Sequence, residues 1–481
     1  MVVIISYVSL VLIAQKFGGP KGHGGPEMDF GTVPDEEVPE LSAEKVISED
    51  EDSTALSLIS NDADKSLLLV KNGASSKVSA SSFEKKAGDS SNDGQSNFYG
   101  LNAAIVVTEG NLSLFNVEVS SWANGSNAVF ATGEKSNIEI DGIKIRTNKD
   151  SSRGLDATYG GSISAKNVDI STKGAHSAAF ATDRGEGNVS VDGGRAVTSG
   201  QGSPVVYSTG NISVSNLEGL AESSEIAVIE GKNSIKLEKV NISGGTKSDH
   251  GNTGCAIMLY QSMSGDAGQG TSALTVNDST LTSNSDGAFF YITNTSSSIS
   301  ISNTKLENQT GKLIQVSQNN SERGWGRRGA NGGVLRFKSE NQNLEGSICV
   351  DEISTASLYF NDGTEFTGSI NSEKQGRVNL YLEKNATISL TADAYVNVLS
   401  LADKKMNNIV SNGYTIYYNK KAKENKWLHG KTINLQDGGK LVGIEMEFKE
   451  PKAFGGDFDS RQKPPAPPKG NPPSGTPPQH M

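Results

Sequence analysis

The sequence predicts an all-β protein: a right-handed parallel β-helix with a flexible N-terminal linker and a proline-rich C-terminal tail. Three observations support this prediction. Short apolar segments recur at spacings of 21 to 32 residues, most of them near 24 to 26. Each is followed by a segment in which apolar and polar residues alternate, the pattern of a strand with one buried face. Proline is almost absent from this region, because paired strands exclude a residue that cannot donate its backbone hydrogen bond.

The first 15 residues form a separate apolar segment. Residues 2–14, VVIISYVSLVLIA, are too few to span a bilayer and resemble the apolar core of a secretory signal. No Lys or Arg precedes them and no clean small-residue cleavage site follows, so we interpret the segment as a signal whose start is missing or misassigned. The alternative is a buried first strand. Residues 16–53, with several glycines and the acidic SEDED, are predicted to be a flexible acidic linker.

The β-helix is predicted over residues 54–445, with its first strands in residues 56–83. A period in the twenties with several short strands per repeat is typical of a solenoid, in which each coil covers the apolar face of the next. The repeated apolar segments are AAIVVTEG from residue 103, AVFATGE from 128, GLDATYG from 154, AAFATDRG from 178, PVVYSTG from 204, EIAVIEG from 225, AIMLYQS from 256, AFFYITN from 288 and KLIQVSQ from 312.

Equivalent apolar positions of these repeats are expected to stack along the axis of the solenoid. We assign seven of them to one interior ladder: Ile105, Phe130, Phe180, Val206, Met258, Phe290 and Ile314. After about residue 345 the spacing tightens but the alternation continues, which predicts further coils. The segment WLHGKTINLQDGGKLVGI, residues 427–444, is predicted to be a hairpin that caps the exposed core.

Residues 446–481 form the proline-rich tail. Of the 14 prolines, only Pro204 lies between Pro39 and Pro451, whereas eight fall within the last 21 residues. Closely spaced prolines favour the extended polyproline II conformation. The tail is therefore predicted to be an extended spacer or a disordered end.

Composition and charge exclude several classes of function. The net charge is −11 and no Lys/Arg cluster is interleaved with aromatic residues, which argues against a nucleic-acid partner because phosphates require concentrated positive charge. No membrane span is expected in the body of the chain. The two cysteines, Cys255 and Cys349, cannot form a disulfide framework or a zinc site, and their apolar surroundings indicate buried thiols.

Several stretches resemble a known group of proteins. They are SSNDGQSNFYGLNAAIVVTEG, SAAFATDRGEGNVSVDGG, GSPVVYSTGNISVSN, VIEGKNSIKLEKV and IMLYQSMSGDAGQG, within residues 87–420. They are similar to secreted, adhesin-like β-helix proteins of anaerobic gut and rumen bacteria, which have a pectin-lyase-like fold. The resemblance implies an extracellular β-helix, but it carries no established activity and no catalytic residues.

The pectin-lyase-like fold includes polysaccharide lyases and glycoside hydrolases, so an enzyme is an alternative, although a fold alone does not decide function. Polygalacturonase-like hydrolases share N-x-D, D-D, G-H-G and R-I-K elements. The body of this chain has no D-D pair and no R-I-K, and its one G-H-G, residues 22–24, lies in the predicted linker. We therefore assign no catalytic residue, expect no cofactor, and favour a protein that is not an enzyme.

Stacking of the coils is expected to bring Asp156, Asp183 and Glu230 to neighbouring corners of the solenoid, with Arg184 beside them. Such an acidic edge is suited to Ca²⁺ or to sugar hydroxyls, so Ca²⁺ is a possible ligand, although the metal content is left open. The alternative is that Asp183 and Arg184 belong to a turn whose side chains cap its own backbone amides.

Two long loops interrupt the regular coils, MLYQSMSGDAGQG and SERGWGRRGANGG. Insertions in solenoids often gather on the binding face. Their candidate ligand-binding residues are Tyr260, Gln261, Trp325, Arg327 and Arg328. The alternative is that these loops only cover the side of the solenoid.

The sequence thus favours an extracellular or cell-surface, adhesin-like protein that binds glycans or a cell-surface protein through one face of the solenoid. A rigid rod with a repeating polar face offers many weak contacts in register, so avidity supplies the affinity. A carbohydrate-active enzyme and a passive structural stalk remain the alternatives.

Overall fold

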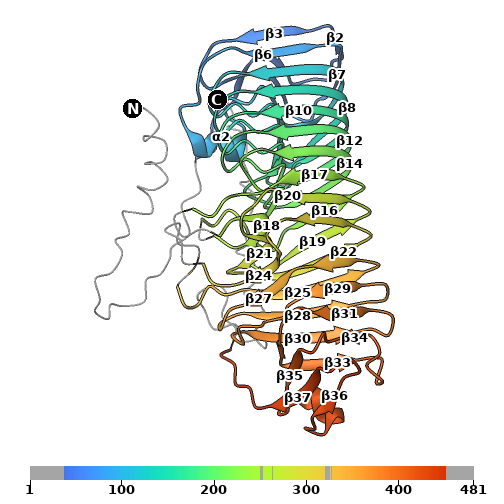
Figure 1. Ribbon diagram of the computed structural model, residues 1–481. Coiled ribbons are helices and arrows are strands. Elements are labelled where there is room, and N and C mark those ends of the chain that lie inside the picture. Colours follow the sequence, from blue (N-terminus) through green and yellow to red (C-terminus); the bar gives the residue numbers. More distant parts are fainter. Residues whose placement is uncertain (1–36, 250–252, 263, 320–325, 327, 451–481) are drawn as a thin grey trace, which may run out of the picture. The chain divides into compact units, whose positions relative to one another are not determined.

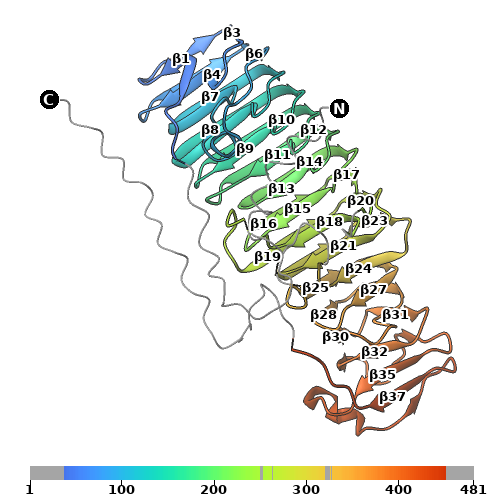
Figure 2. The ribbon, with the colours of Figure 1, turned by 90° about the vertical axis from the view of Figure 1, so that its left-hand side faces the viewer.

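The computed structural model describes residues 37–249, 253–262, 264–319, 326 and 328–450, which form a parallel β-solenoid of about 16 turns (Figures 1 and 2). Strands make up 54% of the chain and helices 3%, so the predicted all-β solenoid is confirmed. Each coil contributes strands to three faces, here named A, B and C, and each strand pairs in parallel with its equivalents in the next coils. The predicted apolar segment 1–15 and the tail beyond residue 450 lie outside the described residues.

Face A contains the apolar segments of the repeats. Its strands are β1 (Ser42–Ile47), β4 (Lys65–Lys71), the beginnings of β7 (Ile105–Ser121) and β8 (Val129–Thr147), β9 (Leu155–Thr158), β11 (Phe180–Thr182), β13 (Val206–Ser208), β15 (Ala227–Glu230), β18 (Cys255–Tyr260), β21 (Ala288–Thr293), β24 (Lys312–Val316), β27 (Ser347–Val350), β32 (Ala394–Val396), β35 (Thr415–Asn419) and β37 (Lys440–Ile444).

Face B follows face A along each coil. Its strands are β2 (Ser53–Thr54), β5 (Ser75–Ser79), the middle of β7 and β8, the first halves of β10 (Ser162–Thr172), β12 (Asn188–Thr198) and β14 (Asn211–Ala221), β16 (Ser234–Glu238), β19 (Thr271–Asn277), β22 (Ser296–Ser302), β25 (Val334–Glu340), β28 (Thr355–Phe360), β30 (Arg377–Leu382) and β33 (Val398–Leu401).

Face C completes the coil. Its strands are β3 (Ser57–Ser60), β6 (Ser82–Lys85), the ends of β7, β8, β10, β12 and β14, β17 (Asn241–Gly244), β20 (Thr280–Ser283), β23 (Lys305–Asn308), β26 (Asn343–Glu345), β29 (Glu365–Gly368), β31 (Thr387–Leu390) and β34 (Ile409–Val410).

A single residue in the left-handed conformation turns the chain from face B to face C within the long strands. Asn167 of β10 has φ 55° and Asn216 of β14 has φ 53°, a conformation that asparagine adopts more readily than most residues. Each side chain also binds the coil before it: Asn167 Nδ2 donates to Asp141 Oδ1 at 2.8 Å, and Asn216 Nδ2 donates to Asp192 Oδ1 at 2.6 Å. The corners are thus held both by backbone conformation and by hydrogen bonds between coils.

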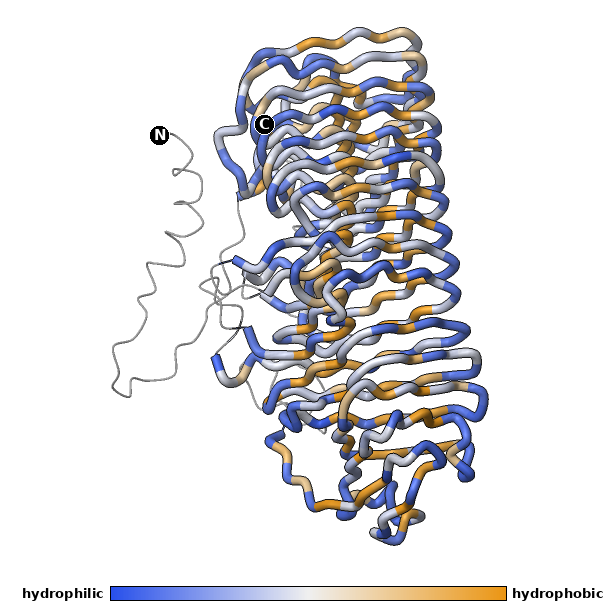
Figure 3. The backbone as a smooth tube through the Cα atoms, viewed as in Figure 1, coloured by the Kyte–Doolittle hydropathy of each residue, from blue (hydrophilic) through white to orange (hydrophobic). Residues whose placement is uncertain are grey.

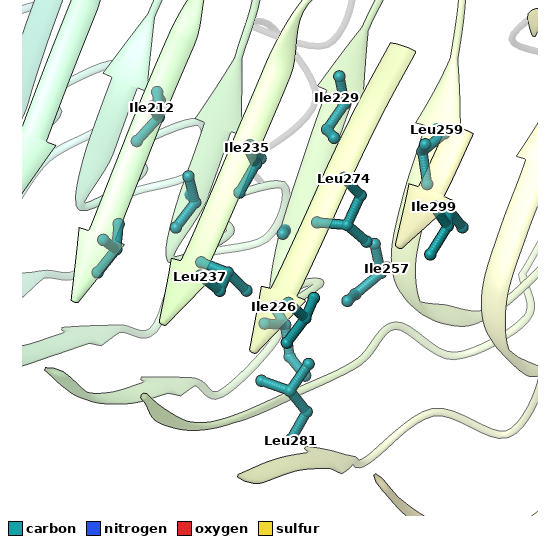
Figure 4. Close-up of a cluster of buried hydrophobic side chains, with 14 of the residues drawn as sticks. Ile212, Ile226, Ile229, Ile235, Leu237, Ile257, Leu259, Leu274, Leu281 and Ile299 are labelled. Atoms are coloured by element: carbon teal, nitrogen blue, oxygen red, sulfur yellow. The ribbon is translucent and has the colours of Figure 1, made fainter. Parts of the chain in front are cut away.

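The apolar core runs through the interior of the coils, and apolar positions recur at the same places in successive coils (Figures 3 and 4). In face A the interior column includes Val129, Phe180, Ile257 and Phe290. The prediction that Phe130 and Met258 belong to this ladder was wrong. Both point outward, into two smaller apolar clusters, because shifting the alignment by one residue moves a side chain to the other side of a sheet.

Face C carries a column of alternating charges on its outer side. The residues in register are Glu118, Lys144, Asp169, Arg195 and Glu218, from β7, β8, β10, β12 and β14. Lys144 Nζ lies 3.4 Å from Glu118 Oε1. Opposite charges on adjacent strands stabilise a sheet modestly, whereas like charges destabilise it.

The two ends of the solenoid differ from each other. At the N-terminal end, β1 pairs with β4. The first strand of the solenoid therefore lies inside residues 16–53, which were assigned to the linker. Its alternation of apolar and polar residues is hard to recognise in the sequence because it contains charged residues such as Lys45. At the C-terminal end, β36 (Ile433–Asn434) pairs antiparallel with β37, and the 3₁₀ helix η1 (Lys423–Leu428) buries Leu428. The predicted capping hairpin is therefore confirmed.

Among the described residues, the α-helix α2 (Asp93–Tyr99) lies between β6 and β7 along the chain. Asn92 caps its first turn by accepting a hydrogen bond from the backbone of Gln95, and Gly100 ends it in the left-handed conformation. Neither helix of the described residues, seven and six residues long, approaches the length of a membrane span.

Candidate functional site

Face A is buried on both sides in its central coils. The core covers its inner side, while α2, residues 261 and 262, and residues 264–268 contact its outer side. Phe98 of α2 accepts a hydrogen bond through its carbonyl oxygen from Thr158 Oγ1 at 2.8 Å, and the ring of Tyr99 stacks on that of Tyr159 at 5.1 Å. This cover places polar side chains of face A away from water.

Arg153 is the centre of the first buried polar cluster. Its Nη1 lies 3.1 Å from Asp156 Oδ2 and its Nη2 lies 2.8 Å from Asp183 Oδ2. Nη1 also donates to Asn97 Oδ1 of α2 at 3.0 Å. Asp156 is fully buried, and its Oδ1 has no hydrogen-bond partner. One guanidinium thus links two coils and the helix that covers them.

Glu230 is the centre of the second cluster. Its carboxylate accepts hydrogen bonds from Tyr207 Oη at 3.0 Å, from Tyr260 Oη at 2.8 Å and from Ser262 Oγ. Three hydroxyl donors therefore hold one carboxylate whose side chain is almost completely buried. The contact with Ser262 ties the loop after β18 to face A.

Arg184 joins the loop to the first cluster. Its Nη2 lies 2.7 Å from Asp266 Oδ1, and its guanidinium lies 4.0 Å from the centroid of the Phe98 ring. The backbone N–H of Arg184 donates to Asp183 Oδ1 at 2.9 Å, which is the local cap that the alternative interpretation of this turn expects. Residues 264–268, α2 and face A are thus connected through charged groups.

Burial controls the protonation of these carboxyl groups. It raises the pKa of Asp183 to about 8, an effect that Arg153 opposes and that Asp266 and Asp156 reinforce. Burial also raises the pKa of Asp156, although the charge of Arg153 opposes this effect. It raises the pKa of Glu230 as well, although the hydrogen bonds from the hydroxyl donors lower it. The pKa of each of these three carboxyl groups is therefore raised by burial, which distinguishes them from carboxyl groups on a solvated acidic edge.

Five of the predicted ligand-binding residues are buried beneath this cover: Asp156, Asp183, Glu230, Tyr260 and Gln261. The repeats do bring Asp156 and Asp183 together, but on strands and under α2, instead of at open corners. Arg328 is exposed, and Trp325 and Arg327 lie outside the described residues. Among the described residues, no group of three or more His, Cys, Asp or Glu side chains is placed to hold a metal ion.

The raised pKa of Asp183 predicts that stability falls as the pH rises. The unfolded carboxyl releases its proton near pH 4 and the folded one near pH 8, so the stability is present below pH 4 and is lost on approaching pH 8. The slope is at most about 1.4 kcal/mol per pH unit. Denaturant unfolding at pH 5 and pH 8 is expected to show a smaller difference for Asp183→Asn than for the unmodified chain.

The control for this experiment is Asp192→Asn on an exposed corner. Hydrogen bonds from Asn216 and Ser215 lower the pKa of Asp192, so its substitution is not expected to reduce the fall of stability between pH 5 and pH 8. An unchanged fall in Asp183→Asn would show that Asp183 is ionised in the folded chain.

A groove on the outer side of face C is open to solvent. It has a volume of about 460 Å³ and crosses the first five coils, from β3 to the end of β10. The strands that carry its lining, β3, β6, β7, β8 and β10, are labelled in Figure 1. Trp122 lines it with 43% of its surface exposed, and Ile59 with 47%. Lys144, Arg146, Thr147, Asn148, Lys173, Glu84 and Glu118 are among the polar residues of its lining.

Sequence reasoning missed this groove. The same turn of three successive coils holds Trp122, Asn148 and Lys173. The backbone N–H of each residue donates to the carbonyl oxygen of the last residue of the face C strand in the preceding coil. An aromatic residue in a turn that holds polar residues in the neighbouring coils was the available signal. The segment SSWANG lacks the repeated apolar pattern that marks the coils, so Trp122 was not assigned to a site.

Comparison with known proteins finds no matching family model, no matching curated protein and no matching solved structure.

Proposed function

We propose that this chain is an extracellular or cell-surface, adhesin-like binding protein and that the groove on face C binds a glycan. The observation that supports this most directly is the exposed Trp122 in a polar groove of about 460 Å³. That volume lies within the range of small-molecule binding sites. A large exposed aromatic side chain is also typical of residues that dominate binding energy.

The groove has the two kinds of surface that a sugar needs. The indole of Trp122 offers a flat apolar face for the C–H groups of a pyranose ring. Lys144 and Arg146 offer N–H donors, and Glu118 offers an acceptor, for the hydroxyl groups. A ligand that contacts several coils at once gains from contacts in register along a rigid scaffold.

A polysaccharide-degrading enzyme is the second candidate, and the buried clusters weigh against it. Such enzymes need two carboxyl groups that reach the glycosidic bond and a water molecule. Asp156 and Asp183 share Arg153, while Glu230 is held by three hydroxyl groups, and all three are covered. A passive stalk remains the third candidate and predicts no ligand at all.

The test is a glycan array probed with the full chain, in the presence of calcium and of a chelator. We expect binding to one class of glycan, and Trp122→Ala is expected to weaken it at least tenfold, which corresponds to about 1.4 kcal/mol. Tyr414→Ala is the matched control, because Tyr414 is 38% exposed and lies outside the groove. Binding that survives in Trp122→Ala would exclude the groove, and an array without binding would refute the glycan proposal.

A further inference from the structure

The outer side of face B carries a stacked aromatic pair near its C-terminal end. The strands β28 and β30 are neighbours (Figure 1). Tyr359 of β28 and Tyr381 of β30 are in register, with ring centroids 4.5 Å apart and ring planes 4° from parallel. The Arg336 guanidinium lies 4.4 Å from the centroid of the Tyr359 ring. The next residue in register after Tyr381 is Ser400, whose side chain is small. Arg336, Tyr359, Tyr381 and Ser400 are here named the tyrosine platform.

The last described residues of the chain lie on the same face. Glu450 Oε1 is 3.3 Å from Arg377 Nη2, and the Arg377 guanidinium lies 5.5 Å from the centroid of the Phe448 ring. Lys449 Nζ is 2.7 Å from Glu352 Oε2. Arg377 is the first residue of β30, and Tyr381 lies four residues further along the strand. The side chains of both residues are therefore on the same side of the sheet. The last described residues therefore lie beside the start of β30, on the face that carries the platform.

The proline-rich part is within reach of the platform. Thirteen residues separate Glu450 from Pro464, and a chain of that length spans at most roughly 45 Å when it is fully extended. Arg377 and Tyr381 are four strand residues apart, or roughly 13 Å. A short linker of this kind gives an effective concentration in the millimolar range, so even a weak contact is populated.

We propose that residues 464–478 dock on the tyrosine platform of face B as a polyproline II segment. Eight prolines in this segment, in the pairs 464–465, 467–468, 472–473 and 477–478, favour the extended conformation that aromatic-lined surfaces recognise. This proposal is independent of the glycan groove, which lies on face C.

The test compares the full chain with a full-length variant in which the eight prolines are serines. Tetranitromethane nitrates accessible tyrosines, and peptide mass spectrometry measures the rate at each residue. We expect Tyr359 and Tyr381 to react at least threefold faster in the serine variant, while the exposed Tyr414 reacts at the same rate in both chains. Equal rates at Tyr359 and Tyr381 in the two chains would overturn the proposal.

A second variant changes the platform and leaves the tail intact. Tyr381→Ala is expected to speed tryptic cleavage after Lys469 at least threefold, since an undocked tail meets the protease more often. Tyr417→Ala is the matched control: Tyr417 stacks on Tyr395 at 4.7 Å in the same manner, but on face A. Similar cleavage rates in Tyr381→Ala and Tyr417→Ala would contradict docking on face B.

Discussion

Replacing Arg153 with methionine is expected to lower the free energy of unfolding by about 3–5 kcal/mol. The substitution removes the cation that lies 3.1 Å from Asp156 and 2.8 Å from Asp183, and both carboxyl groups stay buried. In the folded variant, the carboxyl groups of Asp156 and Asp183 must then either stay charged without a cationic partner or take up a proton. Denaturant unfolding at neutral pH, followed by circular dichroism, measures the loss.

Arg146→Met is the control for this prediction. Arg146 also pairs with an aspartate of the next coil, at 2.6 Å from Asp169, but its side chain is 37% exposed. Exposed pairs of this kind contribute about 0–1 kcal/mol. If Arg153→Met and Arg146→Met cost the same, the buried cluster does not stabilise the coils as argued.

Truncating Phe290 to alanine is expected to cost about 3–5 kcal/mol. Phe290 is fully buried in the interior column between Ile257 and Ile314, and its ring centroid lies 6.0 Å from that of Phe337. The rigid strands on either side cannot collapse into the space that its ring leaves. Denaturant unfolding measures this loss under the same conditions.

Phe290→Leu is the matched substitution, because it keeps an apolar side chain in the column. It is expected to cost clearly less than Phe290→Ala, about 1.5 kcal/mol or less. Equal losses for the two variants would mean that the column tolerates no change of shape, and that the cavity is not the main cost.

The coils were predictable because every repeat faces the same neighbours. Alternation marks faces B and C, where one side of each strand meets the core and the other meets solvent. Face A is covered on both sides, so Val129 and Phe130 are both apolar and the sequence does not distinguish inward from outward positions. The errors at Phe130 and Met258 both come from that face.

The candidate site was also predictable from the sequence only in part. Aligning the repeats brought Asp156 and Asp183 to neighbouring coils, as found. Their burial depends on α2, on residues 261 and 262, and on residues 264–268. These segments come from elsewhere in the chain, so the local sequence around Asp156 and Asp183 does not indicate that they cover the site. Arg153 was overlooked because it precedes its strand, yet it decides whether the two carboxyl groups can be buried at all.

The alternating charges on the outer side of face C affect which insertions or deletions of whole coils the solenoid tolerates. Removing the coil that carries Asp169 would place Lys144 beside Arg195, two like charges on adjacent strands. Removing the coils of Asp169 and Arg195 together would instead place Lys144 beside Glu218 and keep opposite signs in contact. In this part of the solenoid, coils are therefore gained or lost with least penalty in pairs.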